Sequence, residues 1–122
     1  MTEDEERYAA AGRELLTKAR EALAQGDLRQ ASEKGWGAAA QVVKAVATRK
    51  GWLHQNHATL FEVVRQVTLE TGDRRFQENF HIANSLHSNF YENWMLNEAI
   101  EVGLEQVGEF IQGMEHFLAG RT

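Results

Sequence analysis

The chain contains no cysteine and no proline, and none of its apolar runs approaches the length of a membrane span. The lack of cysteine excludes disulfides, thiolate zinc sites, iron–sulfur ligation and a cysteine nucleophile. Without proline to interrupt them, long helices are favoured over a turn-rich β-sandwich. A membrane helix needs about 20 apolar residues, and the acidic start at residues 3–6 is the opposite of a secretory leader. We therefore expect a cytoplasmic protein with no membrane contact.

What is present is enough apolar material for one folded domain. Of the 122 residues, 43% are hydrophobic and 25% are charged, which excludes the disordered class. We expect a single domain over residues 1–122, with residues 1–4 disordered. The sequence has no Gly-rich phosphate loop, no Gly-x-Ser-x-Gly and no His-Glu-x-x-His motif. We therefore expect no cofactor.

The charges are unevenly distributed along the chain. Residues 7–50 carry nine Lys or Arg against four acidic residues, whereas residues 76–120 contain seven glutamates and neither Lys nor Arg. One interpretation is that the two halves attract each other, or that both faces are simply solvated. The other is a basic surface on the first half that contacts phosphate groups.

Apolar periodicity predicts five helices, over residues 4–25, 28–50 and 57–71, over a stripe from Phe76 to Trp94, and over residues 97–118. In the fourth helix the inward stripe includes Tyr91 and Trp94, and in the fifth it begins at Leu96. Asp27, Asn56 and Asn97 are expected to cap the second, third and fifth helices. The predicted fold class is an all-α antiparallel five-helix bundle, with an up-and-down four-helix core and an extra helix.

The second helix has two glycines in its middle, Gly35 and Gly37. Each costs about 1 kcal/mol relative to alanine, so a neighbouring helix is expected to approach closely over Gly35. We expect Trp36, between the two glycines, and His87 to lie on neighbouring helices.

Two histidine patterns in the fourth helix have alternative interpretations. Glu78 and His81 match half of the Glu-x-x-His pattern of di-iron bundles, but a second pair is missing, so no metal site is expected. Arg74, Glu78 and His81 share a face that is typical of a surface salt-bridge ladder. His87 lies in the apolar stripe. It is either a neutral imidazole that donates to a backbone carbonyl or a residue that acts in a cleft.

Two long segments resemble a known family. Residues 25–47, QGDLRQASEKGWGAAAQVVKAVA, resemble the central segment of the PaREP family of small archaeal-type helical proteins, and residues 85–94, SLHSNFYENW, look like its second signature. The resemblance covers residues 5–118. That family is similar in turn to the HEPN superfamily of helical bundles, and residues 56–60, NHATL, are similar to the Thr-His-x-Leu opening of a HEPN helix. The HEPN likeness implies a homodimer and a nucleotidyltransferase-type protein partner.

Some HEPN proteins are metal-independent ribonucleases with an Arg-x(4–6)-His motif, and the resemblance allows two registers here. In the first, Arg74 or Arg75 pairs with His81. In the second, His87 takes the histidine position, but the arginine positions hold Phe80, His81 and Ile82. A ribonuclease stabilises negative charge on its pentavalent phosphate, for which arginine is the natural donor. The missing arginine favours a binding or accessory relative.

The leading hypothesis is therefore a non-catalytic, homodimeric, HEPN-like module, linked to nucleotide or RNA binding, with a groove beside the second and fourth helices. The alternatives are a metal-independent ribonuclease that uses His87, or Arg74 with His81, and a purely structural oligomerisation module. The residues expected to line or support the groove are Glu33, Lys34, Trp36, His87, Asn89 and Tyr91.

Overall fold

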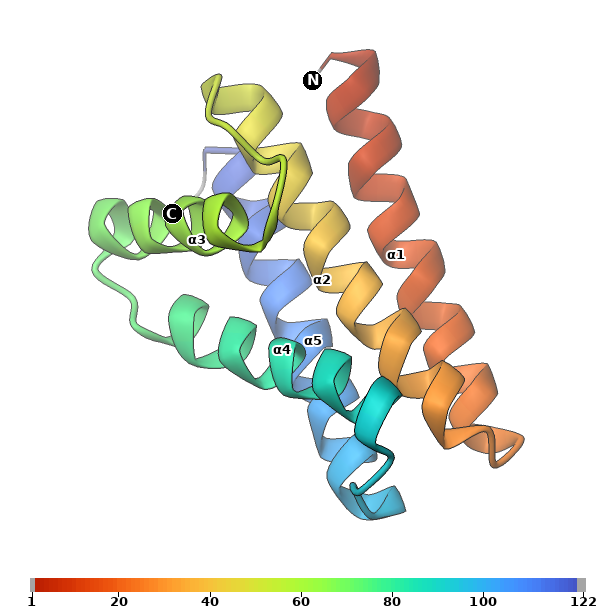
Figure 1. The fold of residues 1–122 in the computed structure, drawn as a ribbon. Helices are drawn as coiled ribbons and strands as arrows, with labels where there is room; N and C mark the ends of the chain where they lie inside the picture. The colour runs from red at the N-terminus through yellow and green to blue at the C-terminus, as the bar shows by residue number, and fades with distance from the viewer. Residues whose placement is uncertain (1, 121–122) are drawn as a thin grey trace.

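The computed structural model describes residues 2–120, and its regular secondary structure is entirely helical over that range. Five helices follow one another along the chain, as Figure 1 shows: α1 (Glu3–Ala24), α2 (Leu28–Lys50), α3 (His57–Thr71), α4 (Arg75–Glu92) and α5 (Asn97–Leu118). The predicted all-α five-helix bundle is confirmed.

The helices pack around α2. α1 and α2 form a long hairpin, α5 runs along both of them, and α4 packs on α2 and α5 (Figure 1). α3 lies across this group and packs on α4 and α2. The core fills the space between α2, α4 and α5, where Phe80, Phe110, Leu86 and Leu104 are almost completely buried.

The first helix begins earlier than predicted. The Thr2 hydroxyl accepts from the Glu5 N–H at 3.3 Å, and the Glu5 carboxylate accepts from the Thr2 N–H at 3.2 Å, which is a reciprocal capping box. Residues 3 and 4, expected to be disordered, therefore form the first turn of α1. Residue 1 lies outside the described residues.

The predicted caps agree with the structure at two of three helices. The Asp27 side chain accepts from the Gln30 N–H, and Asn56 forms a capping box with Thr59. The prediction that Asn97 caps α5 is wrong, because Leu96 holds the cap position and no side chain caps the helix. The turn before α5 is instead held by Asn89, whose Oδ1 accepts from the N–H groups of Trp94 and Met95.

The close approach expected over Gly35 is confirmed. A Cβ on Gly35 would lie 2.6 Å from a methyl carbon of Leu104 and 3.1 Å from one of Leu86. The missing side chain therefore lets α4 and α5 pack tightly against α2. The burial predicted for the ends of two apolar stripes is wrong: Tyr91 is 66% exposed, Trp94 59% and Leu96 73%. These residues lie where α4 ends and the chain turns, beyond the reach of the core.

The opposite charges of the two halves meet at one point across the bundle. Arg13 of α1 donates to the Glu115 carboxylate of α5 at 2.8 Å. Among residues 2–120, no helix combines the length and the apolar character that crossing a bilayer requires.

Candidate functional site

Four aromatic or imidazole rings from three helices meet beside α2. Trp36 of α2 stacks on His57, the first residue of α3, with ring centroids 4.9 Å apart and planes 12° from parallel. His87 of α4 lies 5.2 Å from Trp36 and 5.0 Å from His57. Tyr91, one turn further along α4, meets His87 edge-on at 5.4 Å. We call Trp36, His57, His87 and Tyr91 the ring cluster. Its formation confirms that Trp36 and His87 lie on neighbouring helices.

Local sequence explains why these rings converge. Gly35 lets α4 lie close to α2, which brings His87 against Trp36. The capping box at Asn56 starts α3 at the next residue, and this places His57 over the Trp36 ring. The cluster therefore depends on one close helix contact and one helix start.

His87 is held by a carboxylate. Its Nδ1 lies 3.1 Å from Glu33 Oε1, and the two side chains are 23% and 32% exposed. When Glu33 is ionised it accepts only, so Nδ1 donates and Nε2 is left as the acceptor of the neutral ring. The backbone carbonyl expected as the partner of His87 is therefore replaced by the Glu33 carboxylate. This arrangement leaves one imidazole nitrogen for a ligand or a proton.

The members of the ring cluster differ in access to solvent. Trp36 is only 7% exposed, because Phe80 lies 5.4 Å from it on the core side and His57 covers it. His57 and Tyr91 are exposed. Trp36 is thus the buried member of the cluster, whereas His57, His87 and Tyr91 are accessible to solvent to different degrees.

Asn89 supports the site from below. It is fully buried, and its Nδ2 donates to Ser32 Oγ at 2.8 Å. Its Oδ1 accepts from the N–H groups of Trp94 and Met95, each at 2.8 Å. Asn89 therefore ties the end of α4 and the following turn to α2, and its amide is occupied by the fold.

Lys34 does not join the cluster. Its Nζ donates to Gln30 Oε1, one turn earlier on α2, at 2.8 Å. Lys34 precedes Trp36 by two residues, which is about 200° around a helix, so the two side chains leave α2 in nearly opposite directions. Of the six residues predicted for the groove, the structure brings Glu33, Trp36, His87 and Tyr91 together and places Asn89 beneath them.

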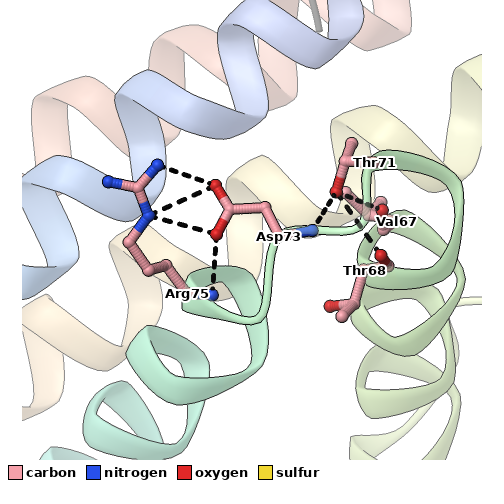
Figure 2. Close-up of polar contacts among 5 residues, drawn as sticks. All are labelled: Val67, Thr68, Thr71, Asp73 and Arg75. Atoms are coloured by element: carbon pink, nitrogen blue, oxygen red, sulfur yellow. Dashed lines mark hydrogen bonds and ion pairs between the residues drawn. The ribbon is translucent and has the colours of Figure 1, made fainter.

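Arg74 and Arg75 are engaged away from His81. Arg74 lies 3.9 Å from Glu78, and its side chain is 85% exposed. Arg75 is bound by Asp73, whose carboxylate accepts from the Arg75 guanidinium at 2.9 and 3.1 Å and from the Arg75 backbone N–H at 3.0 Å (Figure 2). These hydrogen bonds, the guanidinium first, hold the pKa of Asp73 below its ordinary value. The Arg74–Glu78 contact fits the predicted surface ladder.

His81 packs on α3, away from the ring cluster. Its ring lies 5.2 Å from that of Phe61. No group of three metal-ligating side chains lies close enough to hold a metal ion within residues 2–120. In the first ribonuclease register, the arginines at the start of α4 therefore contact acidic residues, and His81 contacts Phe61 instead.

Sequence reasoning missed two residues near the site. His57 was not among the residues predicted for the groove, and its place over Trp36 depends on the path of the connector before α3. Arg29 of α2 donates from Nε to the Phe90 carbonyl at 2.9 Å, and its guanidinium lies 5.6 Å from the Phe90 ring centre. Arg29 lies one turn before Glu33 on α2, and this four-residue spacing could have predicted that both lie on the same face of the helix.

Comparisons with known proteins support the fold. The model of the archaeal PaREP1/PaREP8 family matches residues 7–111. A crystal structure of a protein from Sulfolobus solfataricus superposes with a TM-score of 0.74, at 20% sequence identity, over 97% of this chain and 98% of that one. At that identity the likeness concerns the fold alone. No curated protein matches the chain.

Proposed function

The chain belongs to the archaeal PaREP1/PaREP8 family, and from the geometry of its ring cluster we propose that it is a non-catalytic module that binds nucleotides or single-stranded RNA. The observation that carries the proposal is the convergence of His57 and His87 on Trp36, with Tyr91 edge-on to His87. Rings on a protein surface bind nucleobases by stacking, which contributes about 1–3 kcal/mol per base. The exposed Tyr91 ring is the natural platform.

Polar groups around the rings support this ligand class. His87, oriented by Glu33, offers Nε2 to a base edge or a ribose hydroxyl. Arg29 is exposed at the end of the cluster where α4 terminates, and a guanidinium there suits phosphate oxygens. A stacked base and a paired phosphate describe a nucleotide.

Binding of AMP, ATP and a short RNA, measured by titration calorimetry at low and moderate salt, tests the proposal. We expect binding that weakens as salt rises, because phosphate contacts release counterions. Tyr91→Ala is expected to weaken binding about 5- to 150-fold, the equivalent of one lost stack. His81→Ala, an exposed ring on the same helix but outside the cluster, is the matched control and leaves binding unchanged. Absence of binding at every salt concentration would contradict the proposal and favour a structural oligomerisation module.

A ribonuclease is the second candidate, and the Glu33–His87 contact favours it specifically. A carboxylate that orients an imidazole is a common general-base arrangement. In that function His87 Nε2 accepts the proton of an RNA 2′-hydroxyl, and the 2′-oxygen bonds to phosphorus while Arg29 stabilises the charge on the phosphate. The bond from phosphorus to the 5′-oxygen breaks, and the 5′-oxygen takes a proton from water. It predicts RNA cleavage in the presence of EDTA that disappears in His87→Ala and survives in His81→Ala. Intact RNA after prolonged incubation with the unmodified protein would exclude the ribonuclease, and binding would remain as the proposed function.

We also propose that the module is a homodimer. Trp94 and Leu96 are 59% and 73% exposed in the turn after α4, and exposed apolar patches mark interaction surfaces. A symmetric dimer would bury the same patch of both copies. Trp94→Ser with Leu96→Ser is expected to give monomers in sedimentation equilibrium at tens of micromolar. A strict monomer for the unmodified protein would exclude the dimer.

A nucleotidyltransferase-type protein is the further partner that the HEPN likeness suggests. Co-expression with such a protein and recovery of a stable complex by size exclusion would support it. Separate elution of the two proteins would contradict it.

A further inference from the structure

A cavity lies at the other end of α4 from the ring cluster, between the first turns of α4 and the C-terminal half of α5. Its volume is about 340 Å³, which suits a small molecule. The rings of Phe76 and Phe110 line its apolar side, and Asp73, Arg75 and Glu109 line it with charge. It shares no residue with the ring cluster or with Glu33, so it is a separate place on the molecule.

Asn79 gives this cavity the character of a built site. The residue is only 8% exposed, and its side chain has no hydrogen-bond partner among residues 2–120. No side-chain nitrogen or oxygen that is fully closed off in this range lacks a partner, so the Asn79 amide must reach open space. The space that Asn79 lines is the cavity. Water reaches the Asn79 amide there, and a ligand that bonds to the amide would take the place of that water.

Charge at the cavity indicates what kind of ligand fits. Arg75 is already neutralised by Asp73, in the arrangement that Figure 2 shows. Glu109 is exposed and forms no ion pair within residues 2–120, although its field, with that of Asp73, acts on Arg75. The cavity lining therefore carries two carboxylates and one guanidinium, which leaves one excess negative charge when His116, the histidine in the lining, is neutral. A positively charged ligand therefore complements the cavity.

We propose that this cavity binds a small organic amine. Its ammonium group donates to the Glu109 carboxylate and to the Asn79 carbonyl, and its hydrocarbon part lies against Phe76. Gly113 gives the floor its shape, because a Cβ there would lie 3.0 Å from a ring carbon of Phe76. The site goes beyond the proposed nucleotide function and does not depend on it.

Three ligands of one shape and different charge provide the test: benzylamine, benzyl alcohol and benzoate. Each is titrated into the full chain while the backbone and side-chain amide signals of Asn79, Gln112 and Gly113 are followed by NMR. We expect saturable shifts with benzylamine and none that saturate with benzoate. Equal affinity for the three ligands, or no saturable shift with benzylamine, would overturn the proposal.

Variants separate the ligand role from a structural one. Asn79→Leu replaces the amide with an apolar side chain of similar size, so we expect weaker benzylamine binding, by about tenfold or more. Glu109→Gln is expected to weaken binding about two- to fivefold, as for an exposed ion pair. Glu105→Gln, one turn earlier on α5 and outside this cavity, is the matched control. If Asn79→Leu does not fold, Glu109→Gln decides, and unchanged benzylamine affinity there would refute the site.

Discussion

Two glycines two residues apart on α2 have different neighbours, and this separates helix propensity from packing. A Cβ on Gly35 would meet Leu104 at 2.6 Å, whereas one on Gly37 would meet only a methyl group of Leu15, at 3.3 Å. Gly37 is half-buried, and the Leu15 side chain can move.

We therefore expect opposite effects of alanine at these positions. Gly37→Ala is expected to stabilise the protein by up to about 1 kcal/mol, the gain in helix propensity. Gly35→Ala gains the same propensity but overpacks the core, which costs about 1–3 kcal/mol, so its net effect is destabilising. Urea unfolding followed by circular dichroism measures both. A Gly35→Ala protein as stable as Gly37→Ala would show that α4 and α5 can withdraw from α2 at no cost.

Asn89 links three segments through one amide. Asn89→Leu leaves the Ser32 hydroxyl and the N–H groups of Trp94 and Met95 without their partner. Because the amide is fully buried, we expect a loss of about 2–4 kcal/mol in the free energy of unfolding. Ser88→Ala, at the exposed neighbouring position, is the control and should change stability by less than about 0.5 kcal/mol. If the two variants unfold at the same urea concentration, the Asn89 contacts do not stabilise the fold.

At single residues, the sequence predicted roles that follow from the properties of one helix, but not hydrogen bonds that join several segments. The role of Gly35 followed from the cost of glycine inside a helix. That Asn89 would hold Ser32, Trp94 and Met95 could not be predicted, because these partners come from α2 and from a turn whose path sequence does not define. Lys34 was grouped with Trp36 because both lie in the family-like segment 25–47, but helical geometry separates them.

At the scale of elements, the connection between α3 and α4 is held by a short set of polar contacts. The Thr71 hydroxyl accepts from the Asp73 N–H at 3.2 Å, and Asp73 binds the guanidinium and backbone of Arg75 (Figure 2). Asp73 thus does for the start of α4 what a capping side chain does elsewhere, although the residue in the cap position is Arg74.

This connection should make stability depend on pH in acid. The pKa of Asp73 is lowered by its hydrogen bonds with Arg75, so the folded state prefers the ionised form. Its contribution is present above the ordinary aspartate pKa of about 3.9 and is lost as the pH falls through the lowered value. Asp73→Asn should therefore unfold at a urea midpoint that changes less between pH 5 and pH 2 than that of the unmodified protein. Asp4→Asn, whose partner Arg7 is also exposed, is the control, and equal pH dependence of the two variants would contradict the assignment.

Helix limits were predictable where the chain carries explicit signals. Asp27 and Asn56 were identified because each precedes an apolar periodic segment, and the limits of α2 and α3 agree with the structure. The limits of α5 also agree with the structure, but its cap was wrongly assigned to Asn97, because the residue that organises the preceding turn, Asn89, lies further upstream in α4. Because this side chain comes from the preceding helix, the sequence around the start of α5 contains no capping motif that would indicate it.

At the scale of the molecule, the class and helix count followed from composition and periodicity, but the crossing of α3 did not. Periodicity shows which face of a helix is apolar, whereas the angle at which it lies on others depends on the shapes of both partners. One of the four rings in the cluster depends on that crossing, since His57 reaches Trp36 only because α3 begins beside α2. The pairing of Trp36 with His87 was predictable because it requires only that α2 and α4 be neighbours.

Arg49 links the ends of three helices, and its removal is expected to destabilise the whole bundle. Glu5, in the first turn of α1, is 2% exposed and lies 3.1 Å from Arg49 near the end of α2. Arg49 also donates to the Leu118 carbonyl at the end of α5. Removing the guanidinium leaves both the carboxylate and the carbonyl without this partner.

We expect Arg49→Met to lower the free energy of unfolding by about 1–3 kcal/mol. The figure is below the 3–5 kcal/mol of a fully buried pair because the Arg49 side chain is 42% exposed and water screens it. Lys50→Met, which removes the more exposed pair with Glu70, should cost less than about 1 kcal/mol. The double variant Glu5→Gln with Arg49→Met should recover part of the loss, since no buried charge is left unpaired. Urea unfolding of the three variants measures these differences, and an Arg49→Met protein no less stable than Lys50→Met would show that the three helix ends are held together by packing alone.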